Sequence, residues 1–320
     1  MSRYPFKECV NRVMAAYKDN RAPSTLVIMS RRYNVMEREI TELHRQGKMS
    51  TTNPGRFTSD DIEAFFTFLK TKPGRGGEPV QLKSIKKDLI DLDKLCKFEE
   101  NSCVDVFRAR CPALTKNDHH DRLPVFSPSE IRRIFSKIQT VDDSDPTLLR
   151  SYALLALYFG AGLRTVEAQN AEVNNITFTE QGAYIRLVIV KGSGSYGRPR
   201  QALILPQMVP VLKTYLQWRE DYLKDSGRSS KYVFFSLNEF ERLSDNTLRL
   251  LRRRAENDLD IRYDGRKCRR SYGQYLKDHG VDIECISSLM GHNNTDTTED
   301  YYARISPDMA ILQTMEKLVD

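Results

Sequence analysis

The chain is 320 residues long, with 40% hydrophobic and 29% charged side chains. These values exclude a disordered or fibrous protein, and the length predicts about two domains with buried cores. The longest apolar stretch, Tyr152 to Leu163, has twelve residues, whereas a membrane-spanning helix needs about 20. Because the N-terminus also begins no apolar signal segment, we expect a soluble, intracellular protein.

The positive charge is concentrated in the first part of the chain. Lys and Arg number 50 against 43 Asp and Glu, which gives a net charge of +7. Residues 1–120 hold 22 basic and 16 acidic side chains, whereas residues 121–320 hold 28 and 27. A basic half favours a polyanionic partner, most often nucleic acid, although the same charge could serve solubility alone.

The cysteines are scattered and form no C-x-x-C pair: Cys9, Cys96, Cys103, Cys111, Cys268 and Cys285. In a long chain without a signal segment, such residues are expected to remain reduced thiols. One group of residues comes nearest to a metal-binding set, but its spacing matches no common zinc motif: Cys103, Cys111, His119 and His120. We therefore expect no metal site.

Residues 1–118 are predicted to form a helical domain of about four helices. The segment 57–69 begins with a capping box, Thr58 and Asp61, and continues with apolar residues at helical spacing. Two further segments have amphipathic helical periodicity, 24–45 and 81–98. Pro-Gly breakers separate these segments, so a small bundle is expected.

A second domain is predicted to follow a polar linker at residues 119–126 and to occupy residues 127–320. Its first helix is marked by a capping box, in which Ser127 is the N-cap and Glu130 lies three residues later. The Leu, Ala and Tyr content of residues 145–160 predicts a buried helix.

The periodicity changes after Ile176. The β-branched run 184–190 and the run 202–205 predict two strands, joined by a glycine-rich loop. The chain after Pro206 returns to helical patterns, including everything beyond about residue 245. The expected fold class is therefore mainly α with a small antiparallel β-sheet (α+β).

The glycine-rich loop contains a G-x-G-x-x-G match at residues 192–197. A dinucleotide site needs a helix directly after this motif, because the pyrophosphate lies on the helix N-terminus. A strand is predicted there instead, so we expect no nucleotide cofactor. The loop is either a flexible turn or, as we favour, a basic hairpin that enters a DNA groove with Lys191, Arg198 and Arg200.

Three other segments carry candidate functional side chains. Arg164 follows a Gly-rich turn and precedes a short helix, where an Arg can grip a phosphate, with Glu167 one turn later to orient it. Arg266 and Arg269 share a helical face three residues apart. His292 follows a Met-Gly turn, with tyrosines nine and ten residues later. Taken singly, these segments are better explained as a surface Arg–Glu pair, a solvated or general DNA-backbone face, and core or surface aromatics.

Taken together and in this order, the segments resemble the tyrosine recombinases, the phage-integrase-like site-specific recombinases. The family pattern is G-x-G-L-R-x-x-E, a Lys in a β-hairpin, H-x-x-R, L-G-H, and a Tyr after a Thr-Thr pair. The matching residues here are Arg164, Lys191, Arg266, Arg269, His292 and Tyr301, with 23 residues from Arg269 to His292 and nine from His292 to Tyr301. The resemblance covers about residues 121–305 and fits a helical first domain.

The resemblance implies cleavage and rejoining of DNA through a 3′-phosphotyrosyl intermediate formed by Tyr301. Arg164 and Arg269 would neutralise charge on the scissile phosphate, where His292 would donate a further hydrogen bond. Lys191 would protonate the leaving 5′-oxygen. Because the phosphotyrosyl link stores the bond energy, neither ATP nor a metal is implied.

The sequence departs from the family pattern at Arg266, where the family usually has His and sometimes Lys. Arg cannot act as a general base at neutral pH, so we predict that Arg266 only stabilises charge on the phosphate or phenolate. The alternatives are a type IB-like topoisomerase and a catalytically silent DNA-binding protein of recombinase ancestry.

The implied partners are double-stranded DNA and further copies of the chain. The first domain would be a core-DNA-binding domain that clamps the duplex together with the catalytic domain. The candidates for phosphate contacts are Lys83, Lys86 and Lys87, which fit a solvated helix face equally well. The amphipathic tail 306–319 packs either in cis or on a neighbour in a synaptic tetramer on DNA. The expected location is the cytoplasm, in association with the nucleoid.

Overall fold

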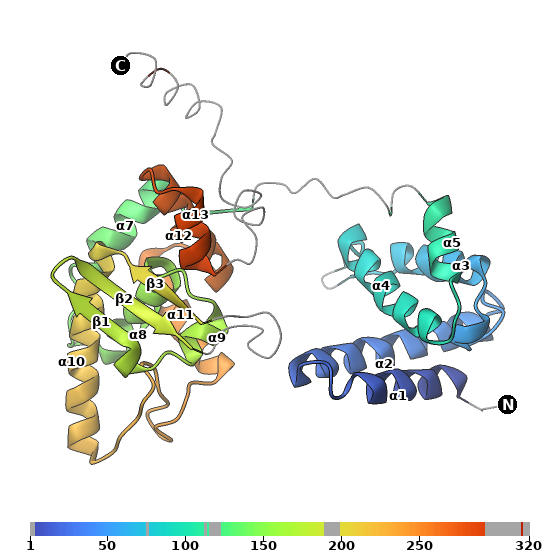
Figure 1. Cartoon of the computed structure of the whole chain (residues 1–320), viewed down its shortest axis with the longest axis horizontal. Coiled ribbons are helices and arrows are strands. Elements are labelled where there is room, and N and C mark those ends of the chain that lie inside the picture. The colour runs from blue at the N-terminus through green and yellow to red at the C-terminus, as the bar shows by residue number, and fades with distance from the viewer. Residues whose placement is uncertain are drawn as a thin grey trace. The chain divides into compact units, whose positions relative to one another are not determined.

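The computed structural model describes residues 4–74, 77–111, 114, 123–188, 199–291 and 315. The chain divides into two compact units, residues 1–120 and 121–320 (Figure 1). Each unit has a hydrophobic core of its own. None of the helices in these residues is long and apolar enough to cross a lipid bilayer.

The first unit is a helical bundle built around α4, which contacts every other helix of the unit. Its helices are α1 (Pro5–Tyr17), α2 (Pro23–Arg45), α3 (Ser59–Thr71), α4 (Leu82–Phe98) and α5 (Cys103–Arg110). The predicted capping box starts α3: the Asp61 N–H donates to Thr58 Oγ1 at 3.2 Å, and the Thr58 N–H donates to Asp61 Oδ2 at 2.9 Å. The helices α1 and α5 were not predicted, and α5 is a short helix that buries Val104 and Phe107 in the bundle.

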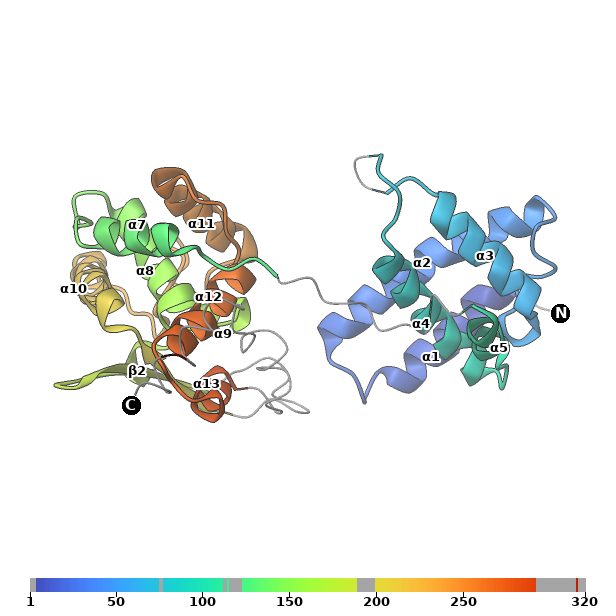
Figure 2. The same ribbon diagram turned by 90° about the horizontal axis from the view of Figure 1, so that it is seen from above.

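The second unit surrounds the buried helix α8, which packs on α10 and α11 (Figure 2). Its helices are α7 (Pro128–Ile138), α8 (Pro146–Leu155), α9 (Thr165–Gln169), α10 (Val209–Ser226), α11 (Asp245–Leu259), α12 (Gly265–Asp278) and α13 (Ile283–Met290). The predicted Ser127/Glu130 capping box is present at the start of α7. A π-helical turn, Ala156–Gly160, continues α8 and is completely buried.

A three-stranded antiparallel sheet lies at one edge of these helices, in the order β1-β2-β3 (Figure 1). The strands are β1 (Ile176–Thr179), β2 (Gly182–Leu187) and β3 (Arg200–Ile204). Tyr184 pairs with Leu203, and Leu187 pairs with Arg200. The predicted fold class, mainly α with a small antiparallel sheet, is confirmed. The four-residue strand β1 was not predicted, because so short a run carries little periodicity.

The packing of the second unit begins before its first helix. Phe126 is 3% exposed and makes edge-on ring contacts with Phe159 and Tyr263, at centroid distances of 5.2 and 5.8 Å. Its N–H donates to Ser271 Oγ at 2.7 Å. Phe126 therefore anchors the end of the segment that we expected to be a linker.

Candidate active site

The turn between α8 and α9 carries Arg164. Gly162 adopts φ +61°, and a Cβ there would lie 2.5 Å from Tyr272 Cδ1, so both the backbone conformation and the close packing require glycine. The reversal places Arg164 at the N-cap of α9, where its own N–H donates to Glu167 Oε2 at 2.8 Å. The local motif thereby sets a guanidinium beside a carboxylate.

Glu167 is the centre of an arginine cluster, which comprises Glu167, Arg164, Arg200 and Arg269. The carboxylate is completely buried. Its Oε1 accepts from Arg164 Nη1 at 2.8 Å, and its Oε2 accepts from Arg200 Nη2 at 2.7 Å. Arg269 Nη1 lies 3.8 Å from Oε2. Three guanidiniums around one carboxylate leave the cluster with a net positive charge, which suits an anionic ligand.

The C-terminal end of α13 is held by the same three arginines. Arg200 donates to the Leu289 carbonyl, Arg269 to the Met290 carbonyl, and Arg164 to the Gly291 carbonyl, the last at 3.5 Å. Carbonyls at a helix C-terminus lack intrahelical partners and carry partial negative charge, so cations are favoured there. The two residues before His292 are therefore held by the site arginines: Met290 by Arg269 and Gly291 by Arg164.

Within the cluster, the opposite charges of Glu167 and its arginines favour the ionised form of each other. Burial by itself would raise the pKa of the Glu167 carboxyl, but the nearby Arg200 and Arg269 charges outweigh burial and lower the pKa below its ordinary value. Glu167 therefore stays ionised. Burial lowers the pKa of Arg200, and the Glu167 charge opposes that effect.

The two predicted site arginines of α12 have different environments. Arg269 is 7% exposed and also donates to the Gly162 carbonyl at 2.6 Å. Arg266, in the first turn, is exposed. The start of α12 borders that of α9, because a Cβ on Gly265 would lie 3.3 Å from Thr165 Oγ1. The structure therefore places Arg164 and Arg269 together beside Glu167, whereas Arg266 lies exposed at the start of α12, next to the start of α9.

The other predicted site residues, Lys191, His292 and Tyr301, lie outside the described residues, as do the glycine-rich motif at 192–197 and, apart from Met315, the tail 306–319. The cysteines, all described, are free. Within the described ranges no group of three or more His, Cys, Asp or Glu side chains is placed to hold a metal ion; His119 and His120 lie outside these ranges.

The expectation that Arg200 belongs to an exposed basic hairpin is wrong, because Arg200 is 8% exposed and bound to Glu167. Period-two alternation could have revealed this. Arg200, Ala202 and Ile204 occupy the buried face of β3, while the residues between them are exposed. The apolar residues of that face therefore predict the burial of the arginine in the same row.

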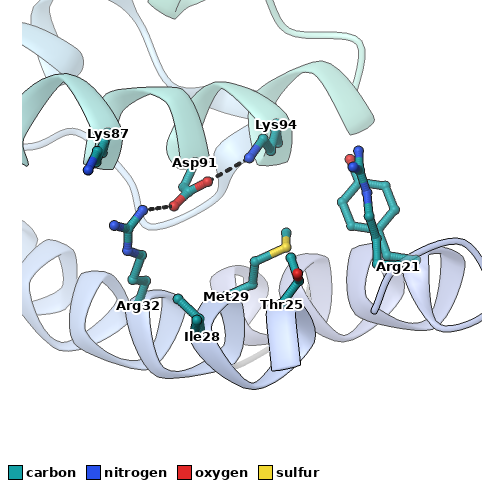
Figure 3. A pocket seen from close by; sticks show the side chains of 9 residues that line it. Arg21, Thr25, Ile28, Met29, Arg32, Lys87, Asp91 and Lys94 are labelled. Atoms are coloured by element: carbon teal, nitrogen blue, oxygen red, sulfur yellow. Dashed lines mark hydrogen bonds and ion pairs between the residues drawn. The ribbon is translucent and has the colours of Figure 1, made fainter. Parts of the chain in front are cut away.

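The first unit contains a second candidate site, a groove between α2 and α4 (Figure 3). Asp91 is 5% exposed, and its two oxygens accept from Arg32 Nη1 at 2.5 Å and Lys94 Nζ at 2.7 Å. The groove is lined by four basic side chains and one carboxylate, together with uncharged residues: Tyr17, Arg21, Thr25, Ile28, Met29, Arg32, Lys87, Asp91 and Lys94. This basic groove also suits an anionic ligand.

Comparison with known proteins identifies the family. The family model described as "Phage integrase family" matches residues 124–308, more than half of the chain. The chain therefore belongs to the phage integrase family, and the resemblance seen in the sequence motifs is confirmed.

Among similar proteins of known sequence are two tyrosine recombinases. XerA of Pyrococcus horikoshii is 31% identical over 167 residues, which cover 52% of this chain and 53% of XerA. XerC of Neisseria meningitidis serogroup B is 27% identical over 261 residues, 79% of this chain and 78% of XerC. The match to the archaeal relative thus spans about half of that protein's length.

Solved structures share the fold. XerH site-specific recombinase, bound to a palindromic difH substrate in a post-cleavage complex, aligns with a TM-score of 0.70 at 14% identity, over 98% of this chain and 96% of XerH. The Tn1549 transposon integrase in complex with transposon right end DNA gives 0.65 at 14% identity, over 97% and 99%. At such identities, these likenesses show the fold alone.

Proposed function

We propose that the chain is a site-specific DNA recombinase that cleaves and rejoins duplex DNA through a 3′-phosphotyrosyl intermediate. The observation that carries this proposal is the cluster at Glu167, which holds Arg164 and Arg269, from distant segments, at the end of α13 that leads to His292. The pairing matches two arginines of the tyrosine recombinase motif. Membership of the phage integrase family supports the same activity.

In the proposed reaction, the Tyr301 hydroxyl gives up its proton to solvent as its oxygen attacks the scissile phosphorus, and the bond from phosphorus to the 5′-oxygen breaks. Arg164 and Arg269 offset the charge that develops on the non-bridging oxygens, and His292 donates a hydrogen bond there. Lys191 gives its proton to the departing 5′-oxygen. A 5′-hydroxyl of another strand then reverses these steps.

The exposure of Arg164 and the energetics of the reaction both bear on the proposed mechanism. The Arg164 side chain is 27% exposed while one of its nitrogens is held by Glu167, so a phosphate can be met by a guanidinium that is already oriented. The reaction conserves the number of phosphodiester bonds, so it needs no energy from ATP. We propose that the arginine charges at the phosphate serve in place of a metal ion. Arg266 is proposed to contribute electrostatically at the phosphate or phenolate.

The proposed partners are duplex DNA and further copies of the chain. The solved XerH and Tn1549 proteins were bound to DNA, and a lambda integrase fragment formed a dimer on a core site. By analogy, we propose that four copies form a synaptic tetramer on DNA and act on the nucleoid in the cytoplasm. The domain of residues 1–118 would be the core-DNA-binding domain, and residues 127–320 would be catalytic.

The function is tested by covalent capture. The full-length protein is incubated with sheared genomic DNA of its source organism, with EDTA and without ATP, and adducts that survive SDS are purified and sequenced. We expect protein on the 3′-phosphate and a free 5′-hydroxyl at a recurrent sequence. No adduct would favour a silent DNA-binding protein, and relaxation of supercoils without exchange between two sites would favour a topoisomerase.

The basic groove of the first unit is proposed to contact the DNA backbone. Lys87 and Arg21 border it, and Asp91 holds Arg32 in place at the same groove. The excess of positive charge attracts phosphates, and each neutralised phosphate releases counterions. The groove thus agrees with the higher basic charge of residues 1–120.

Replacing Lys87 with Gln should weaken binding of a mixed-sequence duplex and make it less sensitive to salt. Loss of one phosphate contact should lower the slope of log K against log salt by about 0.9. Fluorescence anisotropy of the full chain at several salt concentrations measures this slope. Lys70→Gln is the control, because Lys70 is on α3 and does not line the groove; equal effects of both substitutions would contradict the assignment.

A further inference from the structure

Arg200 is the only member of the cluster at Glu167 that has no counterpart among the motif residues assigned above. It is the first residue of β3 and is 8% exposed. One guanidinium nitrogen, Nη2, binds Glu167 Oε2 at 2.7 Å, and the other, Nη1, donates to the Leu289 carbonyl. A single side chain therefore joins the sheet, α9 and the end of α13.

The packing around Arg200 is close as well as polar. A Cβ on Gly291 would lie 2.4 Å from Arg200 Cδ and 3.1 Å from Nε. The backbone at the C-terminal end of α13 thus rests directly on the stem of Arg200. The residue sets the position of this helix end through contact with its backbone and through the bond to Leu289.

We propose that Arg200 is a positioning residue of the active site, which keeps Glu167 and the end of α13 in the arrangement that presents Arg164 and Arg269 to the scissile phosphate. This inference rests on the proposed function. The proposal assigns Arg200 no contact with the substrate, since Arg200 is not one of the motif residues assigned to the phosphate. Its two terminal nitrogens bind Glu167 and the Leu289 carbonyl.

The physical reason is the sharing of one carboxylate. Glu167 Oε2 accepts from Arg200 Nη2 at 2.7 Å and from the Arg164 N–H at 2.8 Å, while Arg269 Nη1 stays at 3.8 Å. Without Arg200, the charge on Oε2 would draw Arg269 toward Glu167, and the Leu289 carbonyl would lose its donor. Both changes would displace the Arg269 guanidinium from the position in which it can bind the scissile phosphate.

A buried arginine can also serve the fold alone, and the unit contains suitable controls for that role. Arg219 is 6% exposed and donates to the Tyr232 carbonyl at 3.0 Å from α10. Arg150 is 7% exposed and donates to the Phe235 carbonyl at 2.7 Å. Neither residue contacts Glu167 in the described structure, so loss of either should affect stability without altering the phosphate site.

The first test compares Arg200→Met and Arg200→Lys with Arg219→Met in the full-length protein. The substrate is a nicked duplex carrying the sequence captured by the wild-type protein. We expect Arg200→Met to bind it within about threefold of wild type but to form the covalent adduct about 100-fold more slowly. Arg200→Lys should recover about tenfold of that loss, because one ammonium keeps the charge but cannot bind both acceptors. Arg219→Met should cleave at a rate within about threefold of wild type, even if it melts earlier.

The second test separates positioning from folding. A methylphosphonate at the scissile position removes one negative oxygen, so the reaction depends less on the placement of the arginines. The deficit of Arg200→Met should therefore shrink from about 100-fold to about tenfold on this substrate. A deficit that is equal on both substrates, or one that Arg219→Met shares, would overturn the inference.

Two further outcomes are decisive. If Arg200→Met does not fold, Arg200→Lys is measured alone, and a wild-type cleavage rate on the phosphodiester would overturn the inference. If the wild-type protein itself forms no adduct with any captured or genomic DNA, the proposed function fails and this inference fails with it. The wild-type control thus distinguishes the two failures.

Discussion

Tyr301→Phe should abolish the covalent attachment of DNA, whereas Tyr302→Phe should retain it. Phenylalanine lacks the oxygen that would form the phosphotyrosyl bond, so no residual cleavage is expected. Tyr301 is chosen over its neighbour by its nine-residue offset from His292. Consecutive residues of a helix point about 100° apart, so only one of the two tyrosines can face the phosphate.

The measurement is the fraction of nicked substrate that migrates as an SDS-stable protein adduct, followed by mapping of the DNA-linked peptide. Both variants should bind the duplex as wild type does, which separates loss of chemistry from loss of folding. The opposite pattern, with Tyr302→Phe inactive and Tyr301→Phe active, would show that the register of the motif is assigned wrongly.

Glu167→Gln should both destabilise the second unit and slow cleavage. Glutamine has the same shape but no charge, so Arg164, Arg200 and Arg269 would surround a neutral group. Removing one partner of a buried ion pair costs about 3–5 kcal/mol, and a unit of this size loses about 2–4 °C of melting temperature per kcal/mol. Glutamine keeps one acceptor oxygen and has an NH2 donor in place of the other, so the arginines would lose one of the two acceptors that orient them, and adduct formation should fall about 100-fold.

The pH dependence provides the control for this prediction. The pKa of Glu167 is lowered in the folded protein, so its stabilising contribution is complete above the unfolded pKa of about 4.3 and is lost as the pH falls through the folded pKa. The difference in unfolding free energy between wild type and Glu167→Gln should therefore be constant near neutral pH and narrow below about pH 4. Urea unfolding at several pH values measures it, and a difference that widens in acid would contradict the role of the ionised carboxylate.

Helix starts were predictable wherever a cap is local. Thr58 and Asp61 lie three residues apart, as do Ser127 and Glu130, and each pair closes its hydrogen bonds within a single turn. The short elements α5 and β1 were not predicted, because so few residues carry little periodicity of their own and are stabilised by packing against distant segments. The helix α1 was predictable, since its buried residues Phe6, Cys9, Val10 and Val13 recur at helical spacing.

Two arginines of the cluster at Glu167 were among the predicted site residues, but the organisation of the cluster was not predicted. The motif order pointed to Arg164 and Arg269, and Glu167 was expected to orient Arg164. The convergence of both arginines on Glu167 was not foreseen, and Arg200 was expected in an exposed hairpin. The burial of Arg200 depends on which face of β3 packs against α9 and α13, and the spacing of residues along the chain does not determine this.

The sequence alone determined the helix caps, the fold class and the family motifs. Each of these depends on residues that are close in the chain or on the order of residues along it. The tertiary structure alone decided that one carboxylate gathers three guanidiniums at the end of α13. A buried charge is tolerated only with opposite charges or hydrogen-bond partners around it. Those partners come from segments that only folding brings together.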